Sequence, residues 1–232
     1  MNPGNQNLTR TNPMQLPFPG FKPKLIQFLT QLNKNNNRDW FAKHKSRYEE
    51  DVLGPALEFV EAFAKPLHRI SPLFLAEPKK IGGSVMRIYR DTRFSKDKTP
   101  YKTNVGIQFR HQMGKDVHSP GYYVHIAADE CFLGIGIWHP DNPTLAKIRE
   151  AILSDPQKWK KCSASGPFSR DFNLAGDSLK RPPRGVEPDH PAIDDLKRKD
   201  FIGVKSLKRS EVEDPKNLSS TSPTHSKPAR RS

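Results

Sequence analysis

The sequence predicts an α+β protein in which N-terminal helices pack on an antiparallel sheet and further short helices follow the sheet. Three observations lead to this fold class. Apolar residues recur at helical spacing in the first third of the chain, alternate with polar residues in the middle, and return to helical spacing afterwards. Runs of helix, strand and helix favour an α+β domain over the alternating order of a parallel sheet.

Three amphipathic helices are expected in the first third of the chain. The first has apolar residues at the i, i+3, i+4, i+7 spacing between Leu25 and Leu32. The asparagine run at 35–37 ends this helix and can cap the second, which extends over residues 40–52. A third amphipathic helix begins at Pro55, because proline suits the first turn of a helix.

Strands are expected from residue 84 onward, where the period of the apolar residues changes to two. Alternation is clearest at 105–109 and continues at 122–126 and 133–137, with a polar turn between the last two segments. This pattern predicts an antiparallel meander with one buried face. Helical spacing returns at 145–152 and leads into a short helical turn.

A two-residue turn at Asp129 and Glu130 predicts the register of the last two strands. A slip by one residue would move the apolar set of a strand to the other face, so burial specifies the parity, whereas a slip by two keeps it. Glycines opposite two aromatic residues leave room either for their rings or for a ligand beside His125. The predicted pairs are Ile126 with Leu133, Val124 with Ile135, Tyr122 with Ile137, His125 with Gly134 and Tyr123 with Gly136.

One domain is expected over residues 18–204. Residues 1–17 are polar and interrupted by prolines, and residues 205–232 are rich in Ser, Thr, Pro, Lys and Arg. These segments offer too few apolar side chains to offset the entropy lost on ordering. Both are therefore expected to be disordered tails, the second of them basic.

A cytoplasmic protein is expected. The longest apolar run, residues 131–138, is far shorter than the ~18 residues that a membrane-spanning helix needs, and the N-terminus lacks the apolar segment of a secretory signal. Cys131 and Cys162 are the only cysteines and fit neither a disulfide framework nor a structural zinc site. We expect no membrane association, and the sequence does not indicate an oligomeric state.

Basic residues concentrate in one segment of the chain. The net charge is +14, and residues 79–110 contribute nine basic against two acidic side chains. Converging cations bind phosphate or carboxylate groups, and aromatic rings among them suit stacking on bases. An anion site is therefore predicted between residues 87 and 102. Its candidate residues are Arg87, Arg90, Arg93, Lys96, Lys98, Tyr101 and Lys102.

The leading functional prediction is binding of an anionic partner, either a phosphorylated small molecule or nucleic acid. The alternative is a hydrolase-type enzyme that uses Asp91, His125 and His139 as acid or base in the same pocket. A third possibility is a non-catalytic structural module in which the arginines brace the sheet through ion pairs. Whether the protein is an enzyme stays open at this point.

No cofactor or metal ion is expected. The chain has no HxH, HxxxH or HExxH spacing for a metal site. It also lacks a Walker loop, a GxSxG elbow and a dinucleotide-binding fingerprint. Nucleotide-driven chemistry is therefore not indicated.

Five stretches together resemble the domain-of-unknown-function family numbered 2461: residues 35–41, 87–102, 121–125, 136–140 and 179–185. The resemblance extends from about Phe18 to Phe201, and the long basic motif is its most specific part. It implies no activity, cofactor or catalytic residues. The family pattern leads us to expect another helical segment with apolar residues after Phe201, where this chain has a Ser/Thr/Pro-rich stretch.

Overall fold

The computed structural model describes residues 18–114 and 118–214. Its N-terminal part is helical, as predicted. The side-chain oxygen of Asn37 accepts a hydrogen bond from the Trp40 N–H at 2.9 Å, so the asparagine run does cap the second helix. The elements are α1 (Pro23–Lys34), α2 (Arg38–Lys43), α3 (Lys45–Tyr48), the π-helical segment η1 (Glu49–Leu53) and α4 (Gly54–Ile70).

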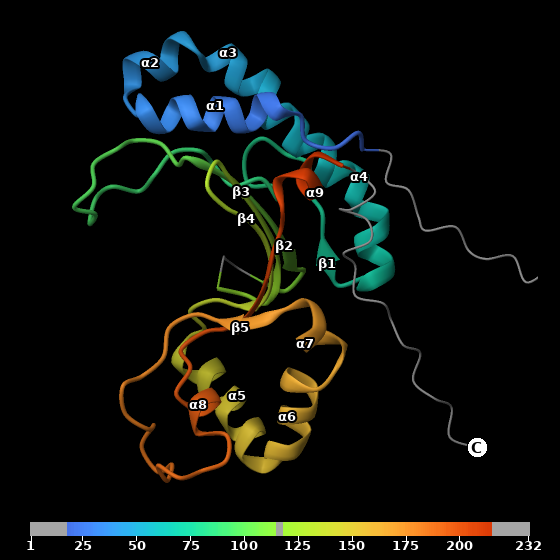
Figure 1. The fold of residues 1–232 in the computed structure, drawn as a ribbon, viewed down its shortest axis with the longest axis vertical. Coiled ribbons are helices and arrows are strands. Elements are labelled where there is room, and N and C mark those ends of the chain that lie inside the picture. Colours follow the sequence, from blue (N-terminus) through green and yellow to red (C-terminus); the bar gives the residue numbers. More distant parts are fainter. Residues whose placement is uncertain (1–17, 115–117, 215–232) are drawn as a thin grey trace, which may run out of the picture.

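Six strands form one antiparallel sheet in the order β1-β2-β3-β4-β6-β5 (Figure 1). The α+β class is confirmed. The strands are β1 (Phe74–Leu75), β2 (Asn104–His111), β3 (Gly121–Ala127), β4 (Cys131–Ile137), β5 (Asn173–Ala175) and β6 (Phe201–Ser206). The later helices are α5 (Asn142–Ser154), α6 (Pro156–Ala164), α7 (Pro167–Asp171), α8 (Ile193–Leu196) and α9 (Arg209–Glu213).

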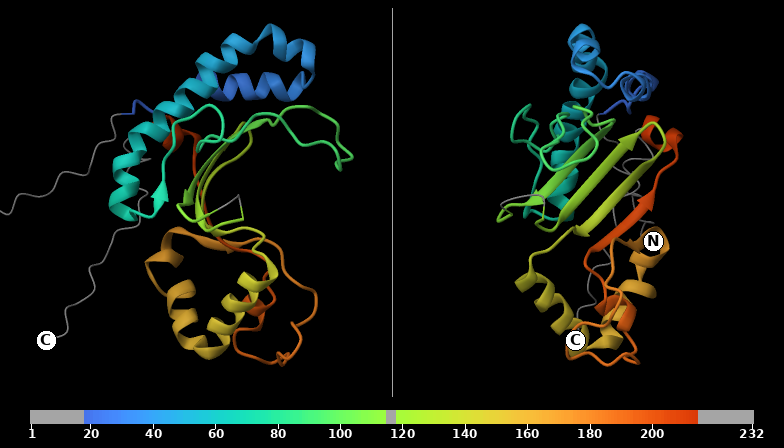
Figure 2. Two further views of the ribbon diagram at one scale, coloured as in Figure 1. Left: turned by 180° about the vertical axis from the view of Figure 1, so that it is seen from behind. Right: turned by 90° about the vertical axis from the view of Figure 1, so that its left-hand side faces the viewer.

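The sheet is curved, and α4 lies against its convex face while α1 passes over one end of the strands (Figures 1 and 2). The main core fills the space between these layers. Phe59 and Phe63 of α4 approach Phe109 of β2 with ring centroids 6.3 and 5.2 Å apart. The inward side chains of β2 and β3, Ile107 and Ile126, are completely buried there.

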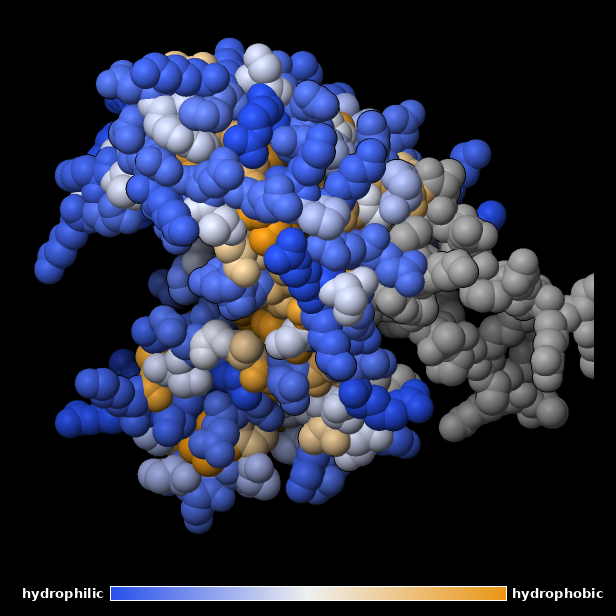
Figure 3. All heavy atoms as spheres, turned by 45° about the horizontal axis from the view of Figure 1, so that its top comes forward, coloured by the Kyte–Doolittle hydropathy of each residue, from blue (hydrophilic) through white to orange (hydrophobic). Residues whose placement is uncertain are grey.

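The concave face of the sheet is open. Residues 87–102 project from one end of this face and residues 176–192 from the other (Figure 2). Figure 3 shows the molecule hollowed between these two parts. Because side chains alternate along a strand, the residues opposite the core-facing set point into this hollow. Among them are Asn104, Gly106, Tyr123, His125, Phe132 and Gly134.

A second, smaller core lies where the chain leaves β4. Its buried side chains are Ile137, Ile152, Leu196 and Phe201. Ile137 of β4 pairs directly with Phe201 of β6, so one continuous sheet contributes to both cores. The predicted return of helical spacing at 145–152 corresponds to α5, whose Ile152 is 1% exposed.

The predicted hairpin register is wrong by two residues, although its parity is right. His125 pairs with Phe132, and Tyr123 rather than His125 pairs with Gly134. The hairpin closes through a 2.9 Å hydrogen bond from the Ala127 N–H to the Glu130 carbonyl, which places the turn at residues 128–129. The other pairs are Ile126 with Cys131, Val124 with Leu133, Tyr122 with Ile135 and Gly121 with Gly136.

The predicted start of the C-terminal tail at residue 205 is also wrong. Residues 205 and 206 complete β6, and α9 follows. Val212 of α9 is 2% exposed in the main core, and its carbonyl accepts the Phe21 N–H at 3.2 Å. A helical segment with a buried apolar residue therefore does follow Phe201. Predictions for residues 1–17 and 215–232 lie outside the described residues.

Candidate anion-binding site

The basic motif forms an arm, residues 87–102, that consists of two extended segments side by side. The Arg90 N–H donates to the Pro100 carbonyl at 2.9 Å, and the Lys102 N–H donates to the Ile88 carbonyl at 2.7 Å. The arm begins and ends beside β2 and reaches past the concave face (Figure 1). Its cations therefore differ in position, some at the tip and others at the base.

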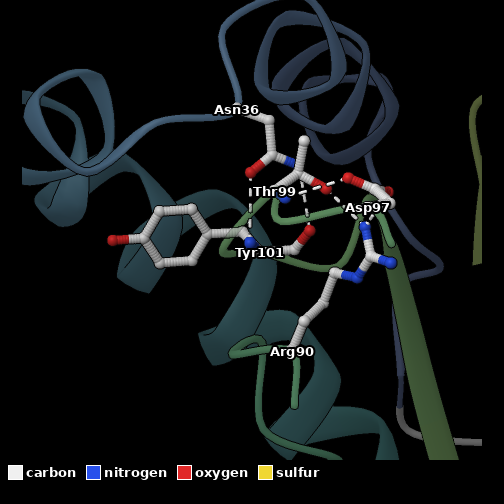
Figure 4. A network of polar contacts seen from close by, with 5 residues as sticks. All are labelled: Asn36, Arg90, Asp97, Thr99 and Tyr101. Atoms are coloured by element: carbon white, nitrogen blue, oxygen red, sulfur yellow. Dashed lines mark hydrogen bonds and ion pairs between the residues drawn. The ribbon is translucent and has the colours of Figure 1, made fainter. Parts of the chain in front are cut away.

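Arg90 braces the inside of this arm, as Figure 4 shows. Its Nη1 donates to the Asp97 carboxylate and to the Thr99 hydroxyl. This bonding lowers the pKa of Asp97 to about 2. Asn36 fixes the arm to the helical layer, because its side chain accepts the Tyr101 N–H at 3.1 Å and donates to the Tyr101 carbonyl at 2.9 Å. Arg90 thus has a structural role.

Arg93 and Asp91 pair with each other near the arm tip. The Nε and Nη2 of Arg93 lie 3.0 and 2.7 Å from the two Asp91 carboxylate oxygens. The hydrogen bonds from Arg93 lower the pKa of Asp91 to about 2. Asp91 is therefore an ionised partner of Arg93 at neutral pH. It is not a proton donor or acceptor beside the histidines.

Tyr101 belongs to the core. It is 5% exposed, and its ring stacks on Phe41 with centroids 4.1 Å apart. Its predicted role at the anion site is wrong for that reason. Lys98 donates to the Thr92 carbonyl at 2.8 Å, and Lys96 is exposed without an ion pair in the part of the chain that the structure describes.

Arg87 and Lys102 lie at the base of the arm. Neither forms an ion pair with a carboxylate of the described residues. Burial lowers the pKa of Lys102, and the positive charge of Arg87 lowers it further. Two neighbouring cations that are not paired with a carboxylate repel each other. A bound anion would lower this repulsion, so such a pair favours anion binding.

Arg87 lines a pocket of about 490 Å³ at the edge of the sheet. The pocket lies between the edge segment 80–89, the outer side of β2 and the helices from α2 to η1. Lys45, Lys80 and Arg110 line it together with Arg87, and none of the described lining residues is acidic. We call this cavity the edge pocket. It combines four cations with the rings of Phe41, Tyr48 and Tyr89.

Tyr48 is one of the aromatic residues that line the edge pocket. Burial and the neighbouring Tyr89 raise the pKa of Tyr48 to about 12, so its hydroxyl keeps its proton at neutral pH. A protonated phenol donates a hydrogen bond. The lining of the pocket therefore includes a neutral phenol and its ring in addition to four positive charges.

His125 lies on the concave face, away from the glycine that the sequence assigned to it. Its ring stacks on Phe132 with centroids 4.6 Å apart, and its Nδ1 lies 3.3 Å from the Tyr123 hydroxyl and 3.5 Å from Asn104 Nδ2. Its Nε2 lies 3.7 Å from Glu130. These contacts remove the glycine-floor argument for a ligand at His125. The ring of Tyr123 is the one that extends over a glycine, Gly106.

The stability of the protein is expected to decrease as the pH falls through about 6.5. Burial lowers the pKa of His125, against a smaller opposite effect of Glu130 and Asp129. The unfolded chain therefore binds this proton more readily than the folded one, which removes stability at acidic pH. Urea titrations at pH 8 and pH 5 measure the free energy of unfolding. Between these two pH values, His125→Gln should lose less of this free energy than the parent.

The exposed His68 supplies the control for this measurement. In His68→Gln, the free energy of unfolding should differ between pH 8 and pH 5 by as much as it does in the parent. An unchanged difference in His125→Gln would contradict the assignment to His125.

His139 is held by a buried carboxylate. Its backbone N–H donates to Asp200 Oδ1 at 2.7 Å, and its Nδ1 lies 2.8 Å from the same oxygen. Asp200 is 1% exposed and also accepts the Asp177 N–H at 2.8 Å. With the Nδ1 proton directed at Asp200, the half-exposed ring leaves Nε2 to accept a proton. His139 adopts a φ of 47°, which these bonds stabilise.

The three acid–base candidates do not share one pocket. Asp91 is at the arm tip, His125 lies beside the β3–β4 turn, and His139 follows the opposite end of β4. The five positions from Phe132 to Ile137 alone correspond to about 17 Å along the strand. The predicted hydrolase constellation is therefore wrong as a single site.

Residues 18–114 and 118–214 contain no group of three or more His, Cys, Asp or Glu side chains arranged to hold a metal ion. None of their helices is long and apolar enough to span a membrane.

Sequence reasoning missed Lys45 and Asp200, and it counted Lys80 and Arg110 as basic without placing them in the site. Lys45 precedes Arg87 by more than forty residues, and no spacing rule relates a helix residue to the edge of a sheet. Asp200 is indistinguishable in the sequence from a surface aspartate.

The fold and this basic region define an α+β protein with a curved antiparallel sheet and a cationic edge pocket. The family model described as conserved hypothetical protein (DUF2461) matches residues 24–227, so the chain belongs to this family. The resemblance found in the sequence is thereby confirmed. Searches of curated proteins and of solved structures gave no match.

Proposed function

We propose that the protein binds a small organic anion, with a phosphate as its charged group, in the edge pocket. The carrying observation is the convergence of Lys45, Lys80, Arg87 and Arg110 on one cavity without an acidic lining residue among those described. A volume of about 490 Å³ is within the usual range for small-molecule sites. Arginine forks suit the planar pairs of oxygens on phosphate.

Two features favour a small ligand over a polymer at this site. The cations converge on a cavity instead of following an extended track, and the pocket walls include the rings of Phe41, Tyr48 and Tyr89. Such rings offer contact for the uncharged part of a ligand. The ion pairs of Arg90 and Arg93 support a structural role for those two arginines, which leaves Arg87 as the part of the motif that faces the ligand.

We also propose a cytoplasmic location. Both cysteines are free thiols, Cys131 buried and Cys162 exposed. An exposed thiol is stable in a reducing compartment, where disulfides are rare.

Thermal unfolding with added ligands tests the proposed function. Inorganic phosphate, ribose 5-phosphate and AMP serve as probes, since a ligand that binds only the folded state stabilises it by about 2.7 kcal/mol at a hundredfold excess over Kd. Arg87→Gln and Arg110→Gln should each weaken the binding of a stabilising probe about 10-fold to 100-fold, because charged hydrogen bonds contribute about 1.5–3 kcal/mol.

Arg93→Gln is the matched control, because its guanidinium is exposed and already paired with Asp91. It should leave the stabilisation as in the parent. The proposal fails if none of the three probes stabilises the parent, or if Arg87→Gln and Arg110→Gln respond like Arg93→Gln.

A further inference from the structure

The concave face of the sheet differs from the edge pocket in the residues that line it. Its floor carries a row of half-buried rings on neighbouring strands, Tyr123 and His125 of β3 and Phe132 of β4. Asn104 adds a polar side chain at one end of this row. Gly106 lies beneath the Tyr123 ring and the Met86 sulfur, and Gly134 lies beside the Cβ of Tyr123. The floor is therefore a half-buried surface rich in aromatic rings.

The Tyr123 ring is spread over the sheet. A Cβ atom at Gly106 would lie 2.7 Å from the Tyr123 hydroxyl oxygen and 3.1 Å from its Cε2, so the ring extends across from β3 to β2. At Gly134, a Cβ atom would lie 3.5 Å from the Cβ of Tyr123. The glycines therefore make room for this half-buried ring over the backbone of β2 and β4. A ring held in this way is a platform on which a planar base can stack.

Short clusters of cations border this floor at both ends. On one side the tip of the arm carries Lys96 and Lys98 next to Phe94, whose side chain is 95% exposed, while the neighbouring Arg93 is paired with Asp91. On the other side, residues 179–185 of the loop between β5 and α8 carry Lys180, Arg181 and Arg184, all of them exposed and without an ion pair among the described residues. The flanks of the same loop carry three acidic residues, Asp177, Glu187 and Asp189. Both segments project on the same side of the sheet in the two opposite views (Figures 1 and 2).

We propose that this concave face binds a single strand of nucleic acid. The strand crosses the hollow seen in Figure 3, with phosphates toward the two basic borders and bases toward the ring of Tyr123 and the exposed Phe94. Charge complementarity selects a polyanion, and the aromatic floor selects unpaired bases, because the faces of paired bases are covered by stacking. This site uses other residues than the edge pocket and does not depend on it.

Fluorescence anisotropy with labelled 12-nucleotide oligo(dT) and oligo(rU) tests this assignment. We expect binding that weakens steeply with salt, since the displaced counterions drive association. The triple variant Lys180→Gln, Arg181→Gln, Arg184→Gln should weaken binding at least 10-fold and flatten the salt dependence. The matched control removes three charges from α6: Lys158→Gln, Lys160→Gln and Lys161→Gln. It should bind like the parent.

Phe94→Ala separates stacking from charge without risk to the fold, because that side chain is almost fully exposed. It should weaken binding about 5-fold to 150-fold, from the ~1–3 kcal/mol that stacking on one ring contributes. Tyr123→Leu should act in the same direction in a variant whose circular dichroism is unchanged.

Four results would overturn the proposal: no binding of either oligonucleotide, equal loss in the α6 control, equal affinity for a duplex of the same length, or full binding by Phe94→Ala. A concentration-dependent dimer that dissociates on Tyr123→Glu would also overturn it, because the concave face would then be occupied by a second copy of the chain. Oligonucleotide binding that is unchanged in Arg87→Gln would support a site on the concave face that is separate from the edge pocket.

Discussion

Replacing Asp200 with alanine is expected to lower the free energy of unfolding by about 3–5 kcal/mol, the usual effect of removing one partner from a buried charged network. The carboxylate is 1% exposed and accepts hydrogen bonds from two backbone N–H groups, those of His139 and Asp177. Its loss leaves both of these part-buried donors without their acceptor, and an unsatisfied donor costs about 1–3 kcal/mol where it is shielded from water.

The contrasting variant is Asp171→Ala. Asp171 is exposed and pairs with Lys205 at 3.4 Å, so its removal should change the free energy of unfolding by less than about 1 kcal/mol. Urea titrations of both variants measure the difference. Similar small effects of the two substitutions would contradict the network assigned to Asp200.

Gly136→Ala is expected to destabilise the protein by about 2–5 kcal/mol, from combined backbone strain and overpacking. Gly136 has a φ of 125°, which residues with a side chain rarely adopt, and an added Cβ would lie 2.1 Å from the Phe201 carbonyl oxygen. That oxygen belongs to the neighbouring strand β6 and cannot move without breaking the pairing of Gly136 with Ile202.

Gly134, two residues earlier on the same strand, provides the control. There an added Cβ would meet its nearest neighbour, the Cβ of Tyr123, at an ordinary 3.5 Å. Gly134→Ala should therefore stay within about 1 kcal/mol of the parent. Thermal denaturation of the pair should show a large loss for Gly136→Ala alone, and equal midpoints would contradict the strand geometry.

Local pattern was sufficient for most of the elements and for the parity of the hairpin. Helical spacing located α1, α4 and α5, and alternation located β2, β3 and β4, because each of these elements buries one side against a core. The register was missed because a slip by two residues keeps the same face buried. The partner of Ile126 is Cys131, which is 9% exposed, and not Leu133 as predicted.

The C-terminal strand and helix could not be predicted from local pattern. β6 joins the sheet between β4 and β5 by pairing with strands from distant parts of the chain. α9 has five residues and one buried side chain, Val212. Such short elements are stabilised by tertiary contacts, so their own sequence has a weak signal.

The site was predicted as a region rather than as a geometry. The charge count located residues 79–110, and Arg87, Lys80 and Arg110 of that segment do line the edge pocket. The count could not show that Arg90 and Arg93 are paired with Asp97 and Asp91, since the pairing depends on how the arm folds back.

Anomalous diffraction from crystals soaked in sodium selenate tests the anion-binding proposal most directly, because selenate is a tetrahedral dianion like phosphate and scatters anomalously. We predict a selenium peak in the edge pocket, within hydrogen-bond distance of Arg87 and of at least one of Lys45, Lys80 and Arg110. The peak should disappear in Arg87→Gln crystals of the same form. Peaks confined to exposed cations elsewhere, with an empty edge pocket, would contradict the account.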